Sequence, residues 1–137
     1  MRKLSALIAV LLLVLVLSAC GGGSKEAAPP VEGGAPSAQA GEKLFAQSVI
    51  GSQAGCISCH SLSPDVVIVG PSMAGIGARA GSTVAGQSAE EYLRQSILEP
   101  NAHVVEGFPE GVMPSGWGDT LSEEQFQSLI AYLLTLK

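Results

Sequence analysis

Apolar residues recur at helical spacing in three segments of the chain, and the pattern is clearest near the C-terminus. Ser122 and Gln125 have the spacing of a capping box, in which each side chain accepts a hydrogen bond from the other residue's backbone. After them, apolar residues recur at positions i, i+3, i+4, i+7 and i+8, namely Phe126, Leu129, Ile130, Leu133 and Leu134. This spacing gives a helix one continuous apolar face. The sequence therefore predicts a C-terminal helix that packs against a core.

Two shorter segments have the same kind of pattern. Residues 88–100 begin with a second capping box, formed by Ser88 and Glu91, and Pro100 ends them. In residues 40–50, the side chains that share one helical face are Leu44, Phe45, Ser48 and Val49. No segment alternates apolar and polar residues over a useful length, and residues 65–71 offer at most one short extended piece with nothing to pair with. The predicted fold class is therefore all-α.

Two long stretches, residues 61–87 and 101–121, separate these helices and are dense in Gly and Pro. Loops of this length are uncommon in a compact domain unless they serve a function. Three short helices also make a poor core, because small domains usually need an additional element that holds them together. A large apolar cofactor, around which the loops wrap, would supply the missing core.

The N-terminal residues are not expected to belong to this fold. Residues 1–19 begin with the basic pair Arg2 and Lys3, continue with an apolar run and close on small residues, which is the layout of an export signal. The sequence LSAC that ends at Cys20 resembles a bacterial lipobox, in which the signal is cleaved before the cysteine and the cysteine is lipidated. An uncleaved anchor helix is the alternative, although the apolar run is short for a span of ~20 residues.

Residues 20–40 are predicted to be the lipidated Cys20 and a flexible linker. They are rich in Gly, Ala, Pro and Ser and carry no large apolar side chain beyond Val31, so they cannot bury enough surface to fold. The folded domain is then predicted to be residues 41–137. The lipid anchor would hold this domain at the extracytoplasmic, periplasmic face of a bacterial cell membrane.

The charge balance argues against nucleic acid as a partner. The chain has a net charge of −5, and removal of residues 1–19 lowers its seven basic residues to five against twelve acidic ones, a net charge of −7. Neutralising phosphates requires clustered Lys and Arg. An acidic surface remains compatible with a protein partner that has a basic docking surface.

The three cysteines point to the candidate chemistry. If Cys20 carries lipid, Cys56 and Cys59 remain, and His60 follows them directly in the sequence CISCH. This is the spacing of covalent haem c attachment, in which both thiols add to the haem vinyl groups and the histidine ligates the iron. The alternatives are a zinc site, which would need a fourth ligand and usually a second Cys/His pair, where the chain offers only the isolated His103; a redox-active dithiol, which would need a βαβ context; and a plain disulfide.

With these motifs in place, residues 41–137 resemble the class I c-type cytochromes, which carry a single haem. The sequences GEKLF, CISCH, GP at Gly70 and Pro71, VMPSGW and LIAYLLTLK occur in the family's order. Residues 96–133 are similar to the cytochrome c domain of haem-copper oxidase subunit II and to monohaem subunits of alternative complex III. The resemblance implies a cytochrome c fold, with three to four short helices and long loops wrapped around one covalent haem.

The resemblance also implies the iron ligands. His60 would be the proximal ligand and Met113 the distal one, and the carbonyl of Pro71 would accept a hydrogen bond from His60 Nδ1, fixing its tautomer. Met73 is the rival methionine, although it lies in the loop that the family uses to cover the proximal side. His103 is a further alternative to Met113, and a surface position is expected for it.

Five further positions are assigned from the residues and the resemblance. Arg79 and Trp117 carry the only guanidinium and indole donors on the two long loops, so either could bind a haem propionate. Gly41 and Phe45 match the family's contact between the first and last helices, with Tyr132 as their partner.

The expected function is one-electron transfer, with no residue catalytic in the acid–base sense. An iron between His and Met has no open position, and the thioether raises its reduction potential. The expected partners are redox proteins, above all a membrane respiratory or photosynthetic complex. The alternative is a haem enzyme with a labile sixth ligand, such as a peroxidase-like protein.

Overall fold

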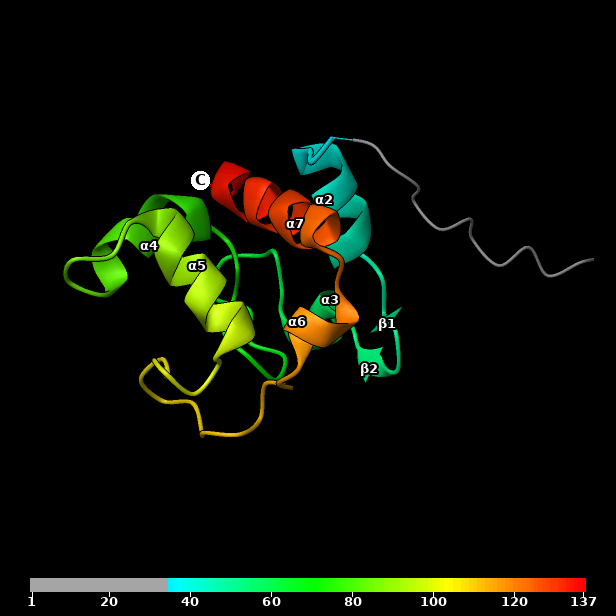
Figure 1. Ribbon diagram of the computed structural model, residues 1–137. Helices are drawn as coiled ribbons and strands as arrows, with labels where there is room; N and C mark the ends of the chain where they lie inside the picture. Colours follow the sequence, from blue (N-terminus) through cyan, green and yellow to red (C-terminus); the bar gives the residue numbers. More distant parts are fainter. Residues whose placement is uncertain (1–34) are drawn as a thin grey trace, which may run out of the picture. The chain divides into compact units, whose positions relative to one another are not determined.

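Six helices and one short hairpin form residues 35–137, the part of the chain that this computed structural model describes (Figure 1). In chain order they are α2 (Ala38–Phe45), β1 (Val49–Ile50), β2 (Gln53–Ala54), α3 (Cys56–Cys59), α4 (Ile76–Thr83), α5 (Ala89–Leu98), α6 (Trp117–Thr120) and α7 (Glu123–Thr135). The predicted helical fold class is confirmed, with one antiparallel hairpin of two-residue strands added. The predicted export signal and Cys20 lie outside the described residues. No helix within residues 35–137 is long and apolar enough to cross a membrane.

Helix α7 has the capping box and the apolar face that the sequence predicts. Ser122 Oγ accepts from Gln125 N–H at 3.2 Å, and Gln125 Oε1 accepts from Ser122 N–H at 2.9 Å. Helix α5 has the matching box, formed by Ser88 and Glu91. The buried core is made mainly of side chains from these two helices and α2, namely Leu44, Phe45, Ile50, Ile76, Ala80, Tyr92, Leu93, Ile97, Trp117, Leu121, Phe126, Leu129, Ile130, Tyr132 and Leu133.

Helices α2 and α7 lie against each other along one side of the domain (Figure 1). At the crossing, a Cβ atom on Gly41 would collide with the carbonyl oxygen of Ser128 and lie 2.7 Å from Tyr132 Cβ. The rings of Phe45 and Tyr132 pack with their centroids 5.7 Å apart. The predicted contact between the first and last helices is therefore confirmed, and it depends on the absence of a side chain at Gly41.

The bounds of the first helix differ from the prediction. Ser37 caps α2 through a hydrogen bond to Ala40 N–H at 3.2 Å, so the helix begins three residues before the predicted domain start. It ends at Phe45, and the predicted helical face at Ser48 and Val49 is wrong, because Val49 lies in β1 and is 60 % exposed. A capping serine within a Gly- and Pro-rich stretch is a weak signal for a helix start.

Helix α4 lies inside a stretch that the sequence predicts to be irregular. Its residues are mostly small, and its N-cap is Gly75, whose positive φ of 68° leaves no side chain to signal the start. The helix is held by the end of α7, where Gly77 N–H donates to the Leu136 carbonyl at 2.8 Å and Lys137 Nζ donates to the Gly77 carbonyl at 2.9 Å. These are tertiary contacts, which a periodicity argument cannot detect.

Candidate functional site

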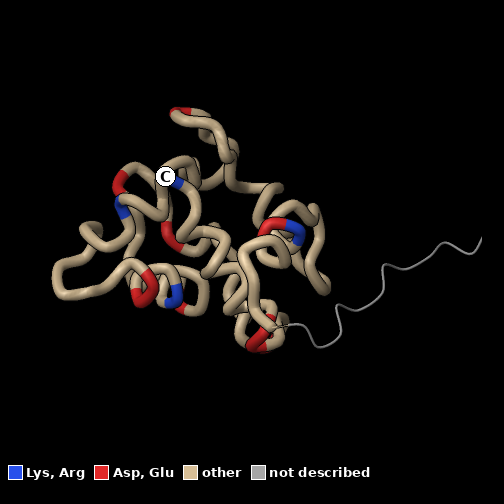
Figure 2. Tube along the Cα trace, turned by 90° about the horizontal axis from the view of Figure 1, so that it is seen from above, with Lys and Arg blue, Asp and Glu red and all other residues tan. Residues whose placement is uncertain are grey.

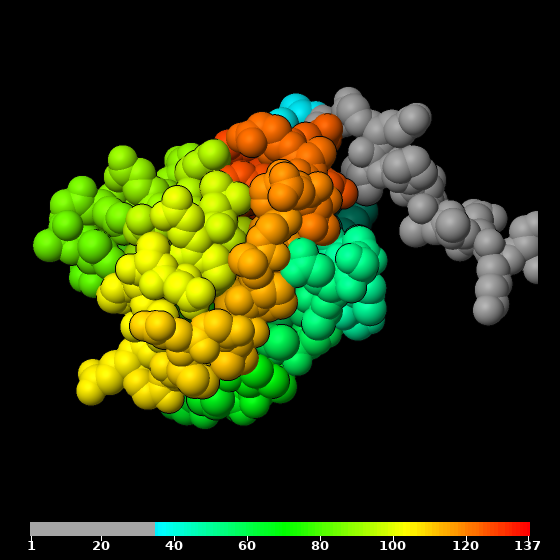
Figure 3. Space-filling model, turned by 60° about the horizontal axis from the view of Figure 1, so that its bottom comes forward, coloured from blue at the N-terminus to red at the C-terminus, as the bar shows by residue number. Residues whose placement is uncertain are grey.

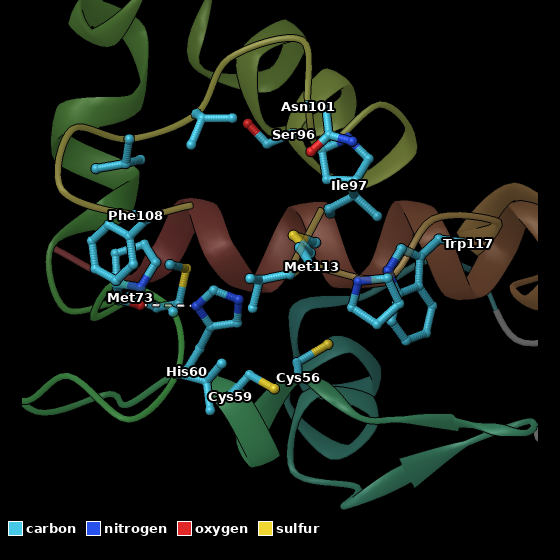
Figure 4. A pocket seen from close by; sticks show the side chains of 18 of the residues that line it. Cys56, Cys59, His60, Met73, Ser96, Ile97, Asn101, Phe108, Met113 and Trp117 are labelled. Carbon is cyan, nitrogen blue, oxygen red and sulfur yellow. Dashed lines mark hydrogen bonds between the residues drawn. The ribbon is translucent and has the colours of Figure 1, made fainter. Parts of the chain in front are cut away.

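The cysteines of the CISCH sequence lie on a single helical turn, α3. Residues three apart on a helix share a face, so Cys56 and Cys59 both line one cavity (Figure 4). The turn is fixed to the preceding chain at Ser48, whose carbonyl accepts from Gly55 N–H and from Ser58 Oγ, each at 2.8 Å. The cysteines are therefore presented by an anchored segment.

His60 follows α3 directly, and its imidazole is held from one side. Its Nδ1 lies 2.8 Å from the carbonyl oxygen of Pro71, so the hydrogen bond expected between these two residues is present (Figure 4). Because a carbonyl can only accept, Nδ1 carries the proton, and in the neutral ring Nε2 keeps a lone pair. A second hydrogen bond of this kind is typical of metal-binding histidines, since it fixes the ring and raises its basicity.

Gly70 allows the chain to approach this imidazole closely. A Cβ atom at Gly70 would lie 2.5 Å from His60 Cε1 and 2.9 Å from Nδ1. The same segment is tied to α3, because the N–H groups of Val69 and Gly70 both donate to the Cys59 carbonyl, at 3.2 and 2.9 Å. Gly70 therefore lets Pro71 reach His60, a role that the sequence analysis did not assign to it.

The cavity that these residues line holds about 1120 Å³ of empty space, part of it open to solvent. Its walls come from segments far apart in the sequence: α3, the loop after it, α5, the loop before α6, and α7. Tyr92, Leu93 and Ile97 line it from α5, and Leu133 lines it from α7. The two long loops thus wrap around one mainly apolar space, as expected for a large apolar cofactor.

Two methionines, Met73 and Met113, line this cavity together with His60 (Figure 4). Met73 lies on the same side of the cavity as His60, because its backbone N–H donates to the carbonyl of Ser61, the residue after His60, at 2.8 Å. Met113 belongs to the loop before α6. That loop is closed by Asn101, whose Oδ1 accepts from Gly111 N–H at 2.8 Å. Asn101 also lines the cavity, and sequence reasoning missed it because loop closure leaves no local pattern.

Trp117 also lines the cavity and is only 4 % exposed. Its indole Nε1 is buried and has no hydrogen-bond partner among the described residues. A buried donor without an acceptor is costly, by about 1–3 kcal/mol. The carboxylate of a group bound in the cavity would supply the acceptor.

Arg79, the other predicted propionate donor, does not line the cavity. Its guanidinium donates to the carbonyl of Ser72 at 2.6 Å and to that of Ala74, so it fixes the loop that leads into α4. This geometry does not support the predicted propionate contact. The physical reason is that α4, which carries Arg79, directs its side chain back along its own N-terminal loop.

His103 is not the surface histidine that the sequence suggests. It is half-buried, lines the cavity and packs edge-on against Tyr92, with ring centroids 5.8 Å apart. His103 therefore remains an alternative to Met113 as the second iron ligand.

The cysteine environment disfavours zinc and dithiol chemistry. Burial raises the pKa of the Cys56 thiol to about 11, which disfavours the thiolate that thiol exchange uses. Within residues 35–137, no group of three or more His, Cys, Asp or Glu side chains gathers to hold a metal ion. The cavity residues do fit a covalent haem, with paired free thiols, a histidine of fixed tautomer, apolar walls and an unpaired indole donor.

Comparison with known proteins agrees with this geometry. The family model described as Cytochrome c matches residues 38–137, which include every element of the described fold. No curated protein matches the chain. The family binds haem c covalently, and the Cys56 and Cys59 pair fits its attachment site. The chain belongs to the cytochrome c family.

Proposed function

We propose that this cytochrome c holds its haem iron between His60 and Met113 and carries single electrons while tethered at the outer face of a membrane. Its family supports haem-based electron transfer. The observation that carries the ligation is the 2.8 Å contact between His60 Nδ1 and Pro71, which leaves Nε2 free in a cavity that Met113 also lines.

Three contacts favour Met113 over its rivals as the second ligand. Met73 is tied through Ser61 to the segment that follows His60, on the same side as the Pro71 acceptor. Met113 lies in a separate loop, held by Asn101 and followed by Pro114, which keeps its backbone extended. His103 already packs against Tyr92.

The residues of the cavity suit electron transfer more than turnover of a substrate. When bound, haem c supplies one-electron Fe(III)/Fe(II) chemistry. His60 and Met113 would hold the iron as neutral protein ligands, and the apolar walls from α5 and α7 would limit water near it. Neutral ligands in mainly apolar surroundings change little between oxidation states.

Spectroscopy of the purified holoprotein tests this ligation. The ferric protein is expected to show the methionine-to-iron charge-transfer band and not to bind cyanide readily at neutral pH. The ferrous protein is expected not to bind CO readily at the same pH. Absence of the band, together with fast cyanide binding, would instead support the haem enzyme with a labile sixth ligand. A spectrum typical of two histidine ligands would assign His103 as the second iron ligand.

Replacement of Trp117 by phenylalanine is expected to change how the reduction potential depends on pH. If the indole N–H binds a haem propionate, it lowers the pKa of that carboxyl, and loss of a hydrogen bond worth about 1.5–3 kcal/mol raises that pKa by about one unit or more. Potentiometry between pH 4 and 9 would show that the pH at which the slope of the reduction potential changes has moved to a higher value. A packing role alone would lower stability without moving that pH.

The membrane tether rests on the sequence of residues 1–40. A cleaved signal, a lipidated Cys20 and a 20-residue linker with an r.m.s. span of roughly 25 Å would let the domain reach a partner without leaving the membrane. We infer that the partners are redox proteins of a respiratory or photosynthetic complex.

Replacement of Cys20 by serine tests the tether. The variant is expected in the soluble extracytoplasmic fraction with an intact haem spectrum, because the thiol that accepts lipid is gone. Wild-type protein should remain with the membranes after a high-salt wash. A variant that also remains there would point to the uncleaved anchor helix.

A further inference from the structure

Exposed aliphatic side chains gather on the two loops that border the cavity. The first loop carries four in succession, Val66, Val67, Ile68 and Val69, with exposures of 45, 61, 52 and 46 %. The second carries Val105 and Val112, with exposures of 37 and 46 %. Val69, Val105 and Val112 also line the cavity, so they stand at its opening. Figure 3 shows the two loops next to each other on one face. These six residues are called the mouth surface below.

The first loop is held in this conformation by hydrogen bonds. Val69 N–H is bound to the Cys59 carbonyl at 3.2 Å, and the Ser63 carbonyl accepts from Ser72 Oγ at 2.7 Å. Asp65, directly before the four aliphatic residues, has a φ of 59°, which is uncommon for a residue other than glycine. The fold therefore fixes the loop with its aliphatic side chains in solvent. Contiguous exposed apolar surface of this kind marks interaction sites.

The charged residues carried by the two loops of the mouth surface have one sign. The chain has no Lys or Arg between Lys43 and Arg79, nor between Arg94 and Lys137, and these two intervals contain both loops. The loops carry Asp65 on the first, and Glu106 and Glu110 on the second. Figure 2 shows how sparse Lys and Arg are along the trace. The mouth surface is thus an apolar centre with carboxylates and no basic residue on its own loops.

We propose that the mouth surface docks a redox protein whose own docking face has an apolar centre and a rim of Lys and Arg. This proposal rests on the proposed electron-transfer function. The opposite charges of the two rims steer the encounter. Apolar contact around the cavity opening excludes water where one electron passes from Fe(II) to the partner's oxidised centre. A second copy of this chain would bring carboxylates against carboxylates, and an anionic bilayer surface would repel them.

Electron exchange with two probe proteins tests the proposal. The reduced holoprotein is mixed by stopped flow with a lysine-rich soluble cytochrome c or with plastocyanin, an acidic copper protein, and one electron reduces Fe(III) or Cu(II) of the probe. We expect the lysine-rich probe to react at least tenfold faster at low ionic strength and to lose that advantage as salt is added. The double variant Val67→Lys/Ile68→Lys should lower its rate about tenfold.

Val49→Lys is the control for a lysine introduced elsewhere on the surface. Val49 is 60 % exposed in β1 and does not line the cavity, so this change replaces one exposed aliphatic side chain by a lysine away from the mouth surface. Its effect should stay below twofold. Methyl NMR provides a second readout, in which shifts of the Val67 and Ile68 signals on addition of the lysine-rich probe should exceed those of Val49.

Two results would overturn the proposal: equal effects of the double variant and the control, or faster reaction with plastocyanin than with the lysine-rich probe. Reaction with ferricyanide, a small oxidant that needs no docking face, separates these results from failure of the proposed function. If ferricyanide oxidises the haem reversibly but the protein probes ignore the Val67→Lys/Ile68→Lys change, only the docking surface is wrong. If ferricyanide does not oxidise it, electron transfer itself is wrong.

Discussion

Replacing Met113 by alanine is expected to open the sixth coordination position of the iron, so that the holoprotein binds cyanide and CO at neutral pH. Met113 is carried by a loop that Asn101 closes, and Pro114 follows it, so the alanine methyl cannot reach where the thioether did. The midpoint potential should fall by on the order of 100 mV, within the range of ~0.8 V that axial ligands span, because a thioether raises the potential. Ligand titration and potentiometry measure both effects.

Met73→Leu is the matched control, because it removes a second thioether from the same cavity at nearly constant volume. This variant should keep the wild-type spectrum and potential and should not bind cyanide. Cyanide binding by Met73→Leu but not by Met113→Ala would assign the iron ligand to Met73. If neither variant binds cyanide, His103 becomes the candidate and ligation by methionine is wrong.

The parts of the fold that could be predicted are those with local signals. The boxes at Ser88 and Ser122 each combine a cap with an apolar period, and both helices form as expected. Helix α4 has neither signal, because its N-cap is Gly75 and its stability comes from contacts of Gly77 with the end of α7. Such a helix depends on the tertiary structure, which residue spacing does not encode.

The candidate site divides in the same way. The CISCH sequence is local, and it places both cysteines and His60 at one cavity because one helical turn carries them. The resemblance contributed Pro71 and Met113, which long loops bring to that cavity. Arg79 does not line the cavity, and its side-chain direction could not be predicted because it is carried by α4, a helix that the sequence pattern did not predict. Gly70 and Asn101 act through loop packing, so only the structure shows them.

Substitution of Gly41 by alanine is expected to destabilise the domain more than any other small-residue change on α2. The new Cβ would collide with the Ser128 carbonyl oxygen and lie 2.7 Å from Tyr132 Cβ, so α2 and α7 would have to separate. Overpacking of this kind costs typically 1–3 kcal/mol, and the obstacle here is backbone, which cannot change rotamer. We expect a net loss of about 2–3 kcal/mol and a fall in Tm of roughly 10 °C or more.

Gly81→Ala separates the crossing from the general effect of alanine in a helix. Gly81 is exposed in α4, and a Cβ there would meet nothing closer than Ala89 N at 3.4 Å. Because alanine loses less backbone entropy on folding, this variant should gain about 0.5–1 kcal/mol. Chemical denaturation of both holoproteins measures the change in the free energy of unfolding, which should be a loss for Gly41→Ala and a gain for Gly81→Ala. Equal stability changes at Gly41 and Gly81 would show that the helices tolerate a wider crossing, and that the glycine at Gly41 does not set the distance between α2 and α7.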